Sequence, residues 1–142
     1  MDKRICLKIE RKHLSWYLDS GYSCHMTGER SMFQDLRTKI RGWVTFRGNL
    51  KDKIVGVGRI SKHSFPSIDN VLFVEGLKHN LLSTSQLCDS GYNVSFNKGE
   101  YIVKDHNSLL IFSAKRQNNL YKINLTNLIN QNVTYLVSIN ND

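Results

Sequence analysis

Short apolar runs separated by turn-forming residues recur along most of the chain. Runs that are rich in β-branched and aromatic residues and bounded by Gly, Asn or Asp are typical of strands. They occupy residues 16–18, 43–46, 53–58, 70–75, 92–96, 101–105, 108–113 and 119–125. Residues 5–10 (ICLKIE) alternate apolar and polar positions, which indicates a half-buried strand. Because turn signals recur roughly every 8–12 residues, the pattern predicts a mainly β protein, either a barrel or a sandwich.

Helical patterns are scarce. Residues 29–36 (ERSMFQDL) predict no more than a turn or two. Residues 80–88 (NLLSTSQLC) favour one short helix, in which Asn80 would cap the N-terminus. Gly91 follows where a left-handed residue commonly ends a helix. The chain is therefore expected to contain one short helix in its C-terminal half.

The composition fits one globular domain in a reducing environment. The chain has 142 residues, enough to bury a core without covalent cross-links. Its three cysteines, Cys6, Cys24 and Cys88, are odd in number and widely spaced, so no disulfide framework is indicated. No apolar run approaches the roughly 18 residues that span a bilayer, and residues 1–13 lack the apolar core of a signal peptide. We therefore expect an intracellular, cytoplasmic protein with no membrane partner.

The net charge of +8 is a property that nucleic-acid-binding proteins share. The basic residues are nevertheless scattered, as at Lys51, Lys53 and Arg59, and do not cluster with aromatic residues. This distribution favours a solvated basic surface. A basic adaptor that binds nucleic acid remains an alternative.

The four residues Asp-Ser-Gly-Tyr occur twice, at 19–22 and at 89–92. An aspartate that activates water must lie on a tight turn at the end of a strand, where Gly permits close backbone approach. Asp19 has this setting, because the apolar residues 16–18 lead into it. Asp-Ser-Gly is also a common turn sequence, so the tripeptide by itself favours an ordinary turn. Asp89 instead follows the predicted helix, so we interpret the second copy as a helix exit.

The first copy lies in a longer motif. Residues 16–28 (WYLDSGYSCHMTG) resemble the protease segment of copia-type retrotransposon Pol polyproteins, whose pattern runs roughly W-Y-x-D-S-G-[CA]-[ST]-x-H-M-[TC]-G. Residues 44–60 (VTFRGNLKDKIVGVGRI) and 68–96 are similar to two further segments of that family, in the same order. Residues 119–125 (NLYKINL) resemble its strand before the pre-integrase region.

The resemblance implies a retropepsin-like closed β-barrel with one short helix. It also implies an aspartic endopeptidase that works as a homodimer, because each chain supplies one catalytic residue, Asp19. The two carboxyls would share one proton and activate water, with no cofactor and no metal. Ser20 and Gly21 would support the active loop, and residues 81–83 would lie beneath it. The substrate would be the element's own polyprotein, cut in the cytoplasm or in a virus-like particle.

The same resemblance places a flap at about residues 46–58. Its named positions are Phe46, Gly48, Asn49 and Gly56. It also divides the chain into an N-terminal extension (1–13), the barrel domain (14–114) and a connector that begins the pre-integrase region (115–142).

Two residues depart from the family pattern. Tyr22 stands where the family has a small residue, and overpacking at such a position typically costs about 1–3 kcal/mol. Arg47 stands where the flap usually has Gly. These departures leave a catalytically inactive remnant of the polyprotein as the main alternative.

Other candidate sites have weaker patterns. Cys6, His13, Cys24 and His25 lack the paired short spacings of a zinc site. His25 and the neighbouring Met26 are expected to pack in the core and loop rather than form a nucleophile with Cys24. Both tryptophans, Trp16 and Trp43, are also expected in the core.

Overall fold

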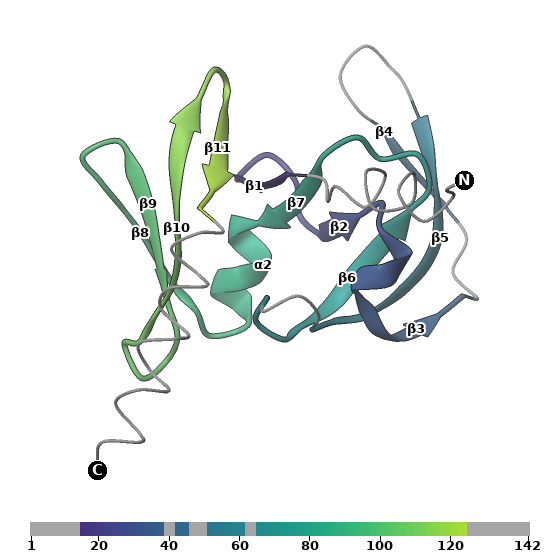
Figure 1. Cartoon of the computed structure of the whole chain (residues 1–142), viewed down its shortest axis with the longest axis horizontal. Helices are drawn as coiled ribbons and strands as arrows, with labels where there is room; N and C mark the ends of the chain where they lie inside the picture. The colour runs from purple at the N-terminus through teal and green to yellow at the C-terminus, as the bar shows by residue number, and fades with distance from the viewer. Residues whose placement is uncertain (1–14, 39–41, 46–50, 62–64, 125–142) are drawn as a thin grey trace, which may run out of the picture.

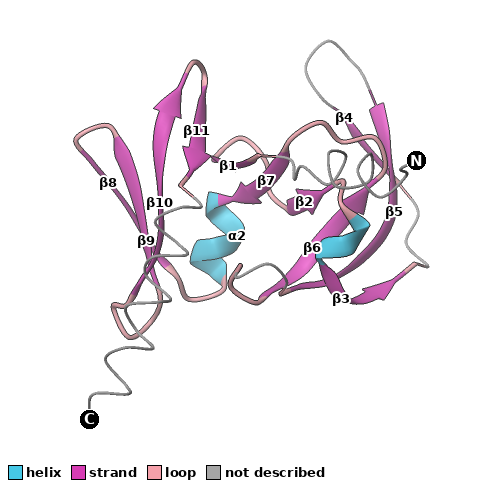
Figure 2. Cartoon of the chain, viewed as in Figure 1, coloured by secondary structure: helices cyan, strands magenta, loops and turns pink. Residues whose placement is uncertain are grey.

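The computed structural model describes residues 15–38, 42–45, 51–61 and 65–124. Figure 1 shows a mainly β chain with a single short α-helix, and Figure 2 separates its strands from its loops. The strands are β1 (Trp16–Asp19), β2 (His25–Thr27), β3 (Phe33–Arg37), β4 (Trp43–Thr45), β5 (Lys51–Ile60), β6 (Ile68–Val74), β7 (Asn80–Ser83), β8 (Asn93–Asn97), β9 (Glu100–Lys104), β10 (Leu110–Gln117) and β11 (Leu120–Ile123). The helices are α2 (Thr84–Asp89) and a 3₁₀ turn, Arg30–Met32.

The strands form one continuous hydrogen-bonded path. Its order is β3-β5-β6-β2-β7-β1-β11-β10-β9-β8. Strand β4 lies off this path and pairs with β5. The closed barrel is not confirmed, because the two ends of this path, β3 and β8, do not pair in the described part of the chain. The antiparallel strands β8–β11 extend away from β2–β7 instead of folding back onto β3 (Figure 1). The prediction of a mainly β fold with one short helix is confirmed.

Strands β1 and β7 lie at the centre of the path and run parallel. Their register pairs Leu18 with Leu82 and Asp19 with Ser83. Apolar side chains leave this pair on both sides: Leu18 and Leu82 enter the larger core cluster, whereas Tyr17 and Leu81 enter the smaller one. Burial on both faces explains why these strands are continuous apolar runs rather than alternating ones.

The predicted helix at 80–88 is correct only in its second half. Residues 80–83 form β7, and α2 begins only at Thr84, where Ser83 is the cap and its hydroxyl accepts from the Gln86 amide. Asn80 therefore caps nothing and is buried in the sheet. Its Oδ1 accepts hydrogen bonds from the Thr27 hydroxyl (2.7 Å) and the Gly28 amide (3.2 Å). The end of the helix is as predicted, since Gly91 has a φ of 96°.

Glycine allows β3 and β5 to approach closely. A Cβ atom on Gly58 would overlap the carbonyl oxygen of Asp35, and one on Gly56 would lie 2.5 Å from that of Arg37. The predicted turn at 29–36 is restricted to the 3₁₀ turn, after which β3 begins at Phe33.

The two tryptophans differ in environment. Trp16 is buried, with 2% of its surface exposed, and its ring packs against Phe65 at 4.7 Å between centroids. Trp43 on β4 is 65% exposed, so the prediction that it lies in the core is wrong. The predicted boundary at residue 114 falls inside β10, and residues 5–10 lie outside the described ranges. None of the described helices is long and apolar enough to cross a membrane.

Candidate functional site

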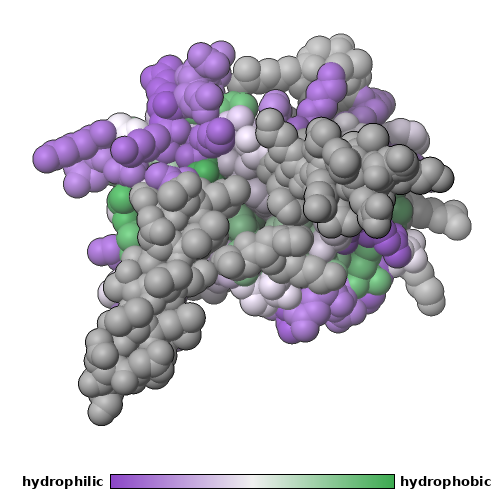
Figure 3. All heavy atoms as spheres, in the orientation of Figure 1, coloured by the Kyte–Doolittle hydropathy of each residue, from purple (hydrophilic) through white to green (hydrophobic). Residues whose placement is uncertain are grey.

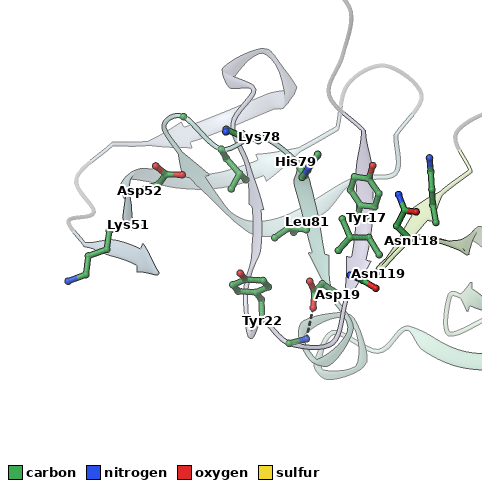
Figure 4. A pocket seen from close by; sticks show the side chains of 15 residues that line it. Tyr17, Asp19, Tyr22, Lys51, Asp52, Lys78, His79, Leu81, Asn118 and Asn119 are labelled. Atoms are coloured by element: carbon green, nitrogen blue, oxygen red, sulfur yellow. Dashed lines mark hydrogen bonds between the residues drawn. The ribbon is translucent and has the colours of Figure 1, made fainter. Parts of the chain in front are cut away.

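The first Asp-Ser-Gly segment forms a tight loop at the C-terminal end of β1. Asp19 is the last residue of that strand, and its side chain is partly buried. Its Oδ1 accepts a hydrogen bond of 2.6 Å from the backbone amide of Gly21, drawn as the dashed line in Figure 4. A Cβ on Gly21 would lie only 3.1 Å from that oxygen, so glycine permits this close approach. The loop thus turns back on the carboxylate and fixes its direction.

Ser83 holds the other end of this loop. It is the register partner of Asp19 across the β1–β7 pair, and it is fully buried. Its hydroxyl donates a hydrogen bond of 2.7 Å to the carbonyl oxygen of Tyr22. One residue therefore fixes both the strand that ends at Asp19 and the chain that leaves the loop.

His25 lies directly behind Ser83 and is 1% exposed. Its Nδ1 accepts a hydrogen bond of 2.9 Å from the Ser83 amide, which places the proton of the neutral ring on Nε2. Its own backbone amide donates to Gln86 Oε1 at 2.8 Å. Burial lowers the pKa of His25 to about 4, so the ring is neutral at pH 7. His25, Ser83 and Gln86 together form a clamp, named here the loop clamp, beneath the Asp19 loop.

The prediction that His25 and Met26 pack in the interior is confirmed, since both are buried. The Cys24 sulfur contacts the Ser23 hydroxyl at 3.8 Å. Among the described residues, no group of three or more His, Cys, Asp or Glu side chains is arranged to hold a metal ion.

Asp19 opens onto a cleft of about 930 Å³. In the view of Figure 4, its carboxylate is seen between Tyr22 and Asn119. Five parts of the chain line the cleft: β1 and its loop, the start of β5, the loop before β7, β7 itself, and the tip of the β10–β11 hairpin. Their lining residues are Tyr17, Asp19, Gly21, Tyr22, Lys51, Asp52, Gly76, Leu77, Lys78, His79, Leu81, Gln117, Asn118, Asn119 and Leu120. The size and the mixture of polar and apolar walls suit a ligand-binding site.

Tyr22 takes up part of this cleft. It is half-buried, lines the cleft and packs against the smaller core cluster, which contains Tyr17, Met26 and Leu81. The extra volume of the ring is therefore accommodated at the cleft surface rather than within a closed core.

The remaining predicted site residues are dispersed. Ser20 is exposed on the Asp19 loop. Gly56 is buried inside β5, where it pairs with Phe73 of β6, so it lies in the body of the sheet. The other flap positions, Phe46, Gly48 and Asn49, lie outside the described residues, as does Arg47. Their role in a flap stays a prediction.

The second Asp-Ser-Gly-Tyr copy has the structure of a helix exit, as predicted. Asp89 is the last residue of α2 and is exposed, Ser90 is the C-cap, and Gly91 is left-handed. Asp89 does not line the cleft. The resemblance implied that residues 81–83 lie beneath the Asp19 loop, and Ser83 does contact that loop through the Tyr22 carbonyl. The sequence does not predict the contacts of Ser83 with His25 and Gln86, or the position of the hairpin tip at 117–120. No local signal marks either, because their contacts join residues far apart in the chain.

Comparison with known proteins adds one match. A family model described as "Pol polyprotein, beta-barrel domain" matches residues 16–92, more than half of the chain. The matched segment contains the Asp19 loop, the loop clamp and α2, and it ends before β8. None of the curated proteins and none of the solved structures matches the chain.

Proposed function

The chain belongs to the Pol polyprotein β-barrel domain family, as a segment of a retrotransposon Pol polyprotein, and from this premise we propose that it is the polyprotein's aspartic endopeptidase. The observation that carries the proposal is the position of Asp19. Asp19 is the last residue of a buried central strand. Its carboxylate accepts a hydrogen bond from the Gly21 amide and faces a cleft large enough for a peptide. This is the setting that a water-activating carboxylate requires.

One chain supplies only half of the catalytic centre. Aspartic proteolysis uses two facing carboxyls, and the other described acidic residue in the cleft, Asp52, comes from a different strand, β5. The proposed enzyme is therefore a two-fold symmetric homodimer, in which Asp19 of each protomer meets at the axis. Two carboxyls at that distance share one proton and titrate as a pair.

In the reaction, the ionised Asp19 takes a proton from a bound water, and the oxygen of that water attacks the peptide carbonyl carbon. The protonated Asp19 of the other protomer donates a hydrogen bond to the carbonyl oxygen. When the tetrahedral intermediate collapses, the C–N bond breaks and the leaving nitrogen takes up the proton that the first Asp19 accepted from the water, which returns that carboxyl to its ionised form. The Gly21 amide holds one oxygen of each carboxylate in place during these steps, and the loop clamp holds the backbone beneath it.

The proposed substrate is the polyprotein itself, at junctions such as residues 125–142, which follow β11 in the sequence. Overlapping eight-residue peptides that span residues 125–142 are suitable probes. Purified chain should cleave at least one of them, and Asp19→Asn should abolish that cleavage. Asp89→Asn is the matched control, because it changes the same residue type in the same tetrapeptide at the end of α2. Sedimentation equilibrium tests the dimer, and a strict monomer that still cleaves would contradict the shared centre.

The position of Tyr22 supports a second candidate, a non-catalytic remnant of the same domain. Its ring occupies cleft space next to Asp19, where a peptide would bind. The remnant predicts that the chain folds and dimerises normally but cleaves none of the probe peptides.

A further inference from the structure

The cleft has a wall that the family match does not include. The matched segment ends at residue 92, yet four of the lining residues come from the tip of the β10–β11 hairpin: Gln117 and Leu120, which end the two strands, and Asn118 and Asn119, which form the turn. The motif at residues 16–28 gives no indication that this turn lies near Asp19. Its contribution to the site follows from the way the sheet is assembled.

Backbone pairing fixes the turn relative to Asp19. Strand β11 runs antiparallel to β1, with Leu18 opposite Tyr121 and Tyr17 opposite Lys122. The next step of this register brings Leu120 level with Asp19, and both residues line the cleft. The first residue after the turn therefore lies beside the catalytic strand, and the turn itself projects past its end.

The packing of β10 and contacts within the hairpin also hold the turn in place. Phe112 and Ala114 of β10 are buried in the larger core cluster, and β10 continues to Gln117, which pairs with Leu120. Asn118 has a φ of 59°, a conformation that Asn tolerates in two-residue hairpin turns. Its carbonyl oxygen accepts a hydrogen bond of 3.1 Å from Arg116 Nε. The wall is thus a braced hairpin tip rather than a loose loop.

The chemistry of this wall differs from that of the opposite wall. Across the cleft lie charged side chains, Lys51, Asp52 and Lys78, whereas the turn offers three consecutive carboxamides. Gln117, Asn118 and Asn119 are all exposed, and Figure 3 shows hydrophilic side chains over the visible face of this hairpin end. A carboxamide both donates and accepts hydrogen bonds, as does the backbone of an extended peptide.

We propose that the β10–β11 turn is a wall of the peptide-binding site, and that the side chains of Asn118 and Asn119 hydrogen-bond the backbone of the bound polyprotein peptide. The inference rests on the proposed function for its choice of ligand. It assigns to residues outside the family match a share of substrate binding, with no part in the chemical step. Loss of these carboxamides weakens peptide binding and leaves bond cleavage at saturating peptide unchanged.

The test uses the full chain carrying Asp19→Asn, so that probe peptides bind without being cut. Binding of the peptides spanning residues 125–142 is measured by titration calorimetry and by changes in backbone amide shifts. With Asn118→Gly and Asn119→Ala combined, the dissociation constant should rise about threefold to tenfold for each hydrogen bond lost. Glycine at 118 keeps the left-handed backbone available, so the hairpin is preserved.

The matched control is Lys98→Gly in the β8–β9 turn. Lys98 has a φ of 55°, lies at a hairpin tip of the same sheet, and does not line the cleft. It should leave peptide binding unchanged. In the chain with Asp19 intact, the double variant should raise KM and leave kcat the same.

The outcomes separate this inference from the proposed function. Peptide that binds and perturbs the amides of residues 117–120, without being cleaved by the intact chain, supports the wall and contradicts the protease. Peptide that perturbs β1 and β7 but not the turn, or that binds the double variant as tightly as its parent, overturns the wall. Absence of binding by every probe peptide overturns it as well.

Discussion

The hydroxyl of Ser83 donates a hydrogen bond of 2.7 Å to the carbonyl oxygen of Tyr22, 61 residues earlier in the chain. The same oxygen of Ser83 accepts from the Gln86 amide at the start of α2, at 3.2 Å. A buried hydroxyl thus joins the Asp19 loop to the only described α-helix. Disturbing it should affect stability and the geometry of Asp19 together.

Ser83→Ala is expected to lower the free energy of unfolding by about 1–2 kcal/mol, because it removes a helix cap and leaves the Tyr22 carbonyl without this donor. Urea denaturation measures the change, and any peptide cleavage should fall with it. Ser95→Ala, on the exposed face of β8, is the control and should leave both quantities unchanged. Full stability in Ser83→Ala would contradict the role of the clamp.

His25 should make stability depend on pH. The pKa of His25 in the folded chain is about 4, below the ordinary value of 6.5. Between these pH values the ring is protonated in the unfolded chain and neutral in the folded chain. Stability from this group is fully present above pH 6.5 and declines as the pH falls towards 4. The shift corresponds to about 3 kcal/mol. Urea unfolding at several pH values between 7 and 4 measures it.

The comparison for that experiment is His25→Asn, which keeps an acceptor near the Nδ1 position but does not titrate. Its stability should fall less steeply than that of the unmodified chain across this pH range. His106→Asn, at an exposed site, should retain the original slope. Parallel curves for the unmodified chain and His25→Asn would show that His25 does not titrate as described.

The two tryptophans should respond oppositely to truncation. Trp16→Ala leaves a large cavity against Phe65 and should cost about 3–5 kcal/mol in unfolding free energy. Trp43→Ala removes a mostly exposed ring, and its effect should stay within about 0.5 kcal/mol. Thermal unfolding of both variants, side by side, measures the contrast; similar losses would place Trp43 in the core after all.

Tyr22→Cys should enlarge the cleft next to Asp19. Since the ring lines the cleft, its removal should lower KM for the probe peptides, or restore cleavage if the unmodified chain is inactive. Tyr92→Cys is the control, because Tyr92 is the same residue of the second tetrapeptide and lies outside the cleft. Unchanged kinetics in Tyr22→Cys would locate any defect elsewhere.

Apolar patterning predicted eight of the described strands, since each of those runs overlaps a strand of the structure. The failure to predict the other three strands, β2, β3 and β7, has physical causes. Strand β2 has only three residues, and β3 is mostly exposed, so neither shows a long apolar run. The pattern at residues 80–88 predicts a helix from residue 80 because a short apolar run is compatible with either structure. Burial on both faces of β7 decides in favour of a strand at 80–83.

The candidate site likewise combines residues that the sequence predicts with residues that only the fold brings together. Asp19, Ser20 and Gly21 are contiguous, and the longer motif at residues 16–28 marks them as candidate site residues. His25 and Ser83 are 58 residues apart, and the turn at 117–120 reaches Asp19 only through the pairing of β11 with β1. Contacts of this kind depend on the whole sheet, so a local pattern does not encode them.

Strand β1 is hydrogen-bonded on both sides, by β7 and by β11. It therefore has no open edge to offer, and a second protomer cannot reach Asp19 by extending the sheet. In the proposed homodimer, the two copies would therefore meet end to end, loop against loop, with their central strands pointing at one another across the axis. In that arrangement the association would depend on the few residues around each loop, so assembly of the proposed dimer and assembly of its catalytic centre would be a single event.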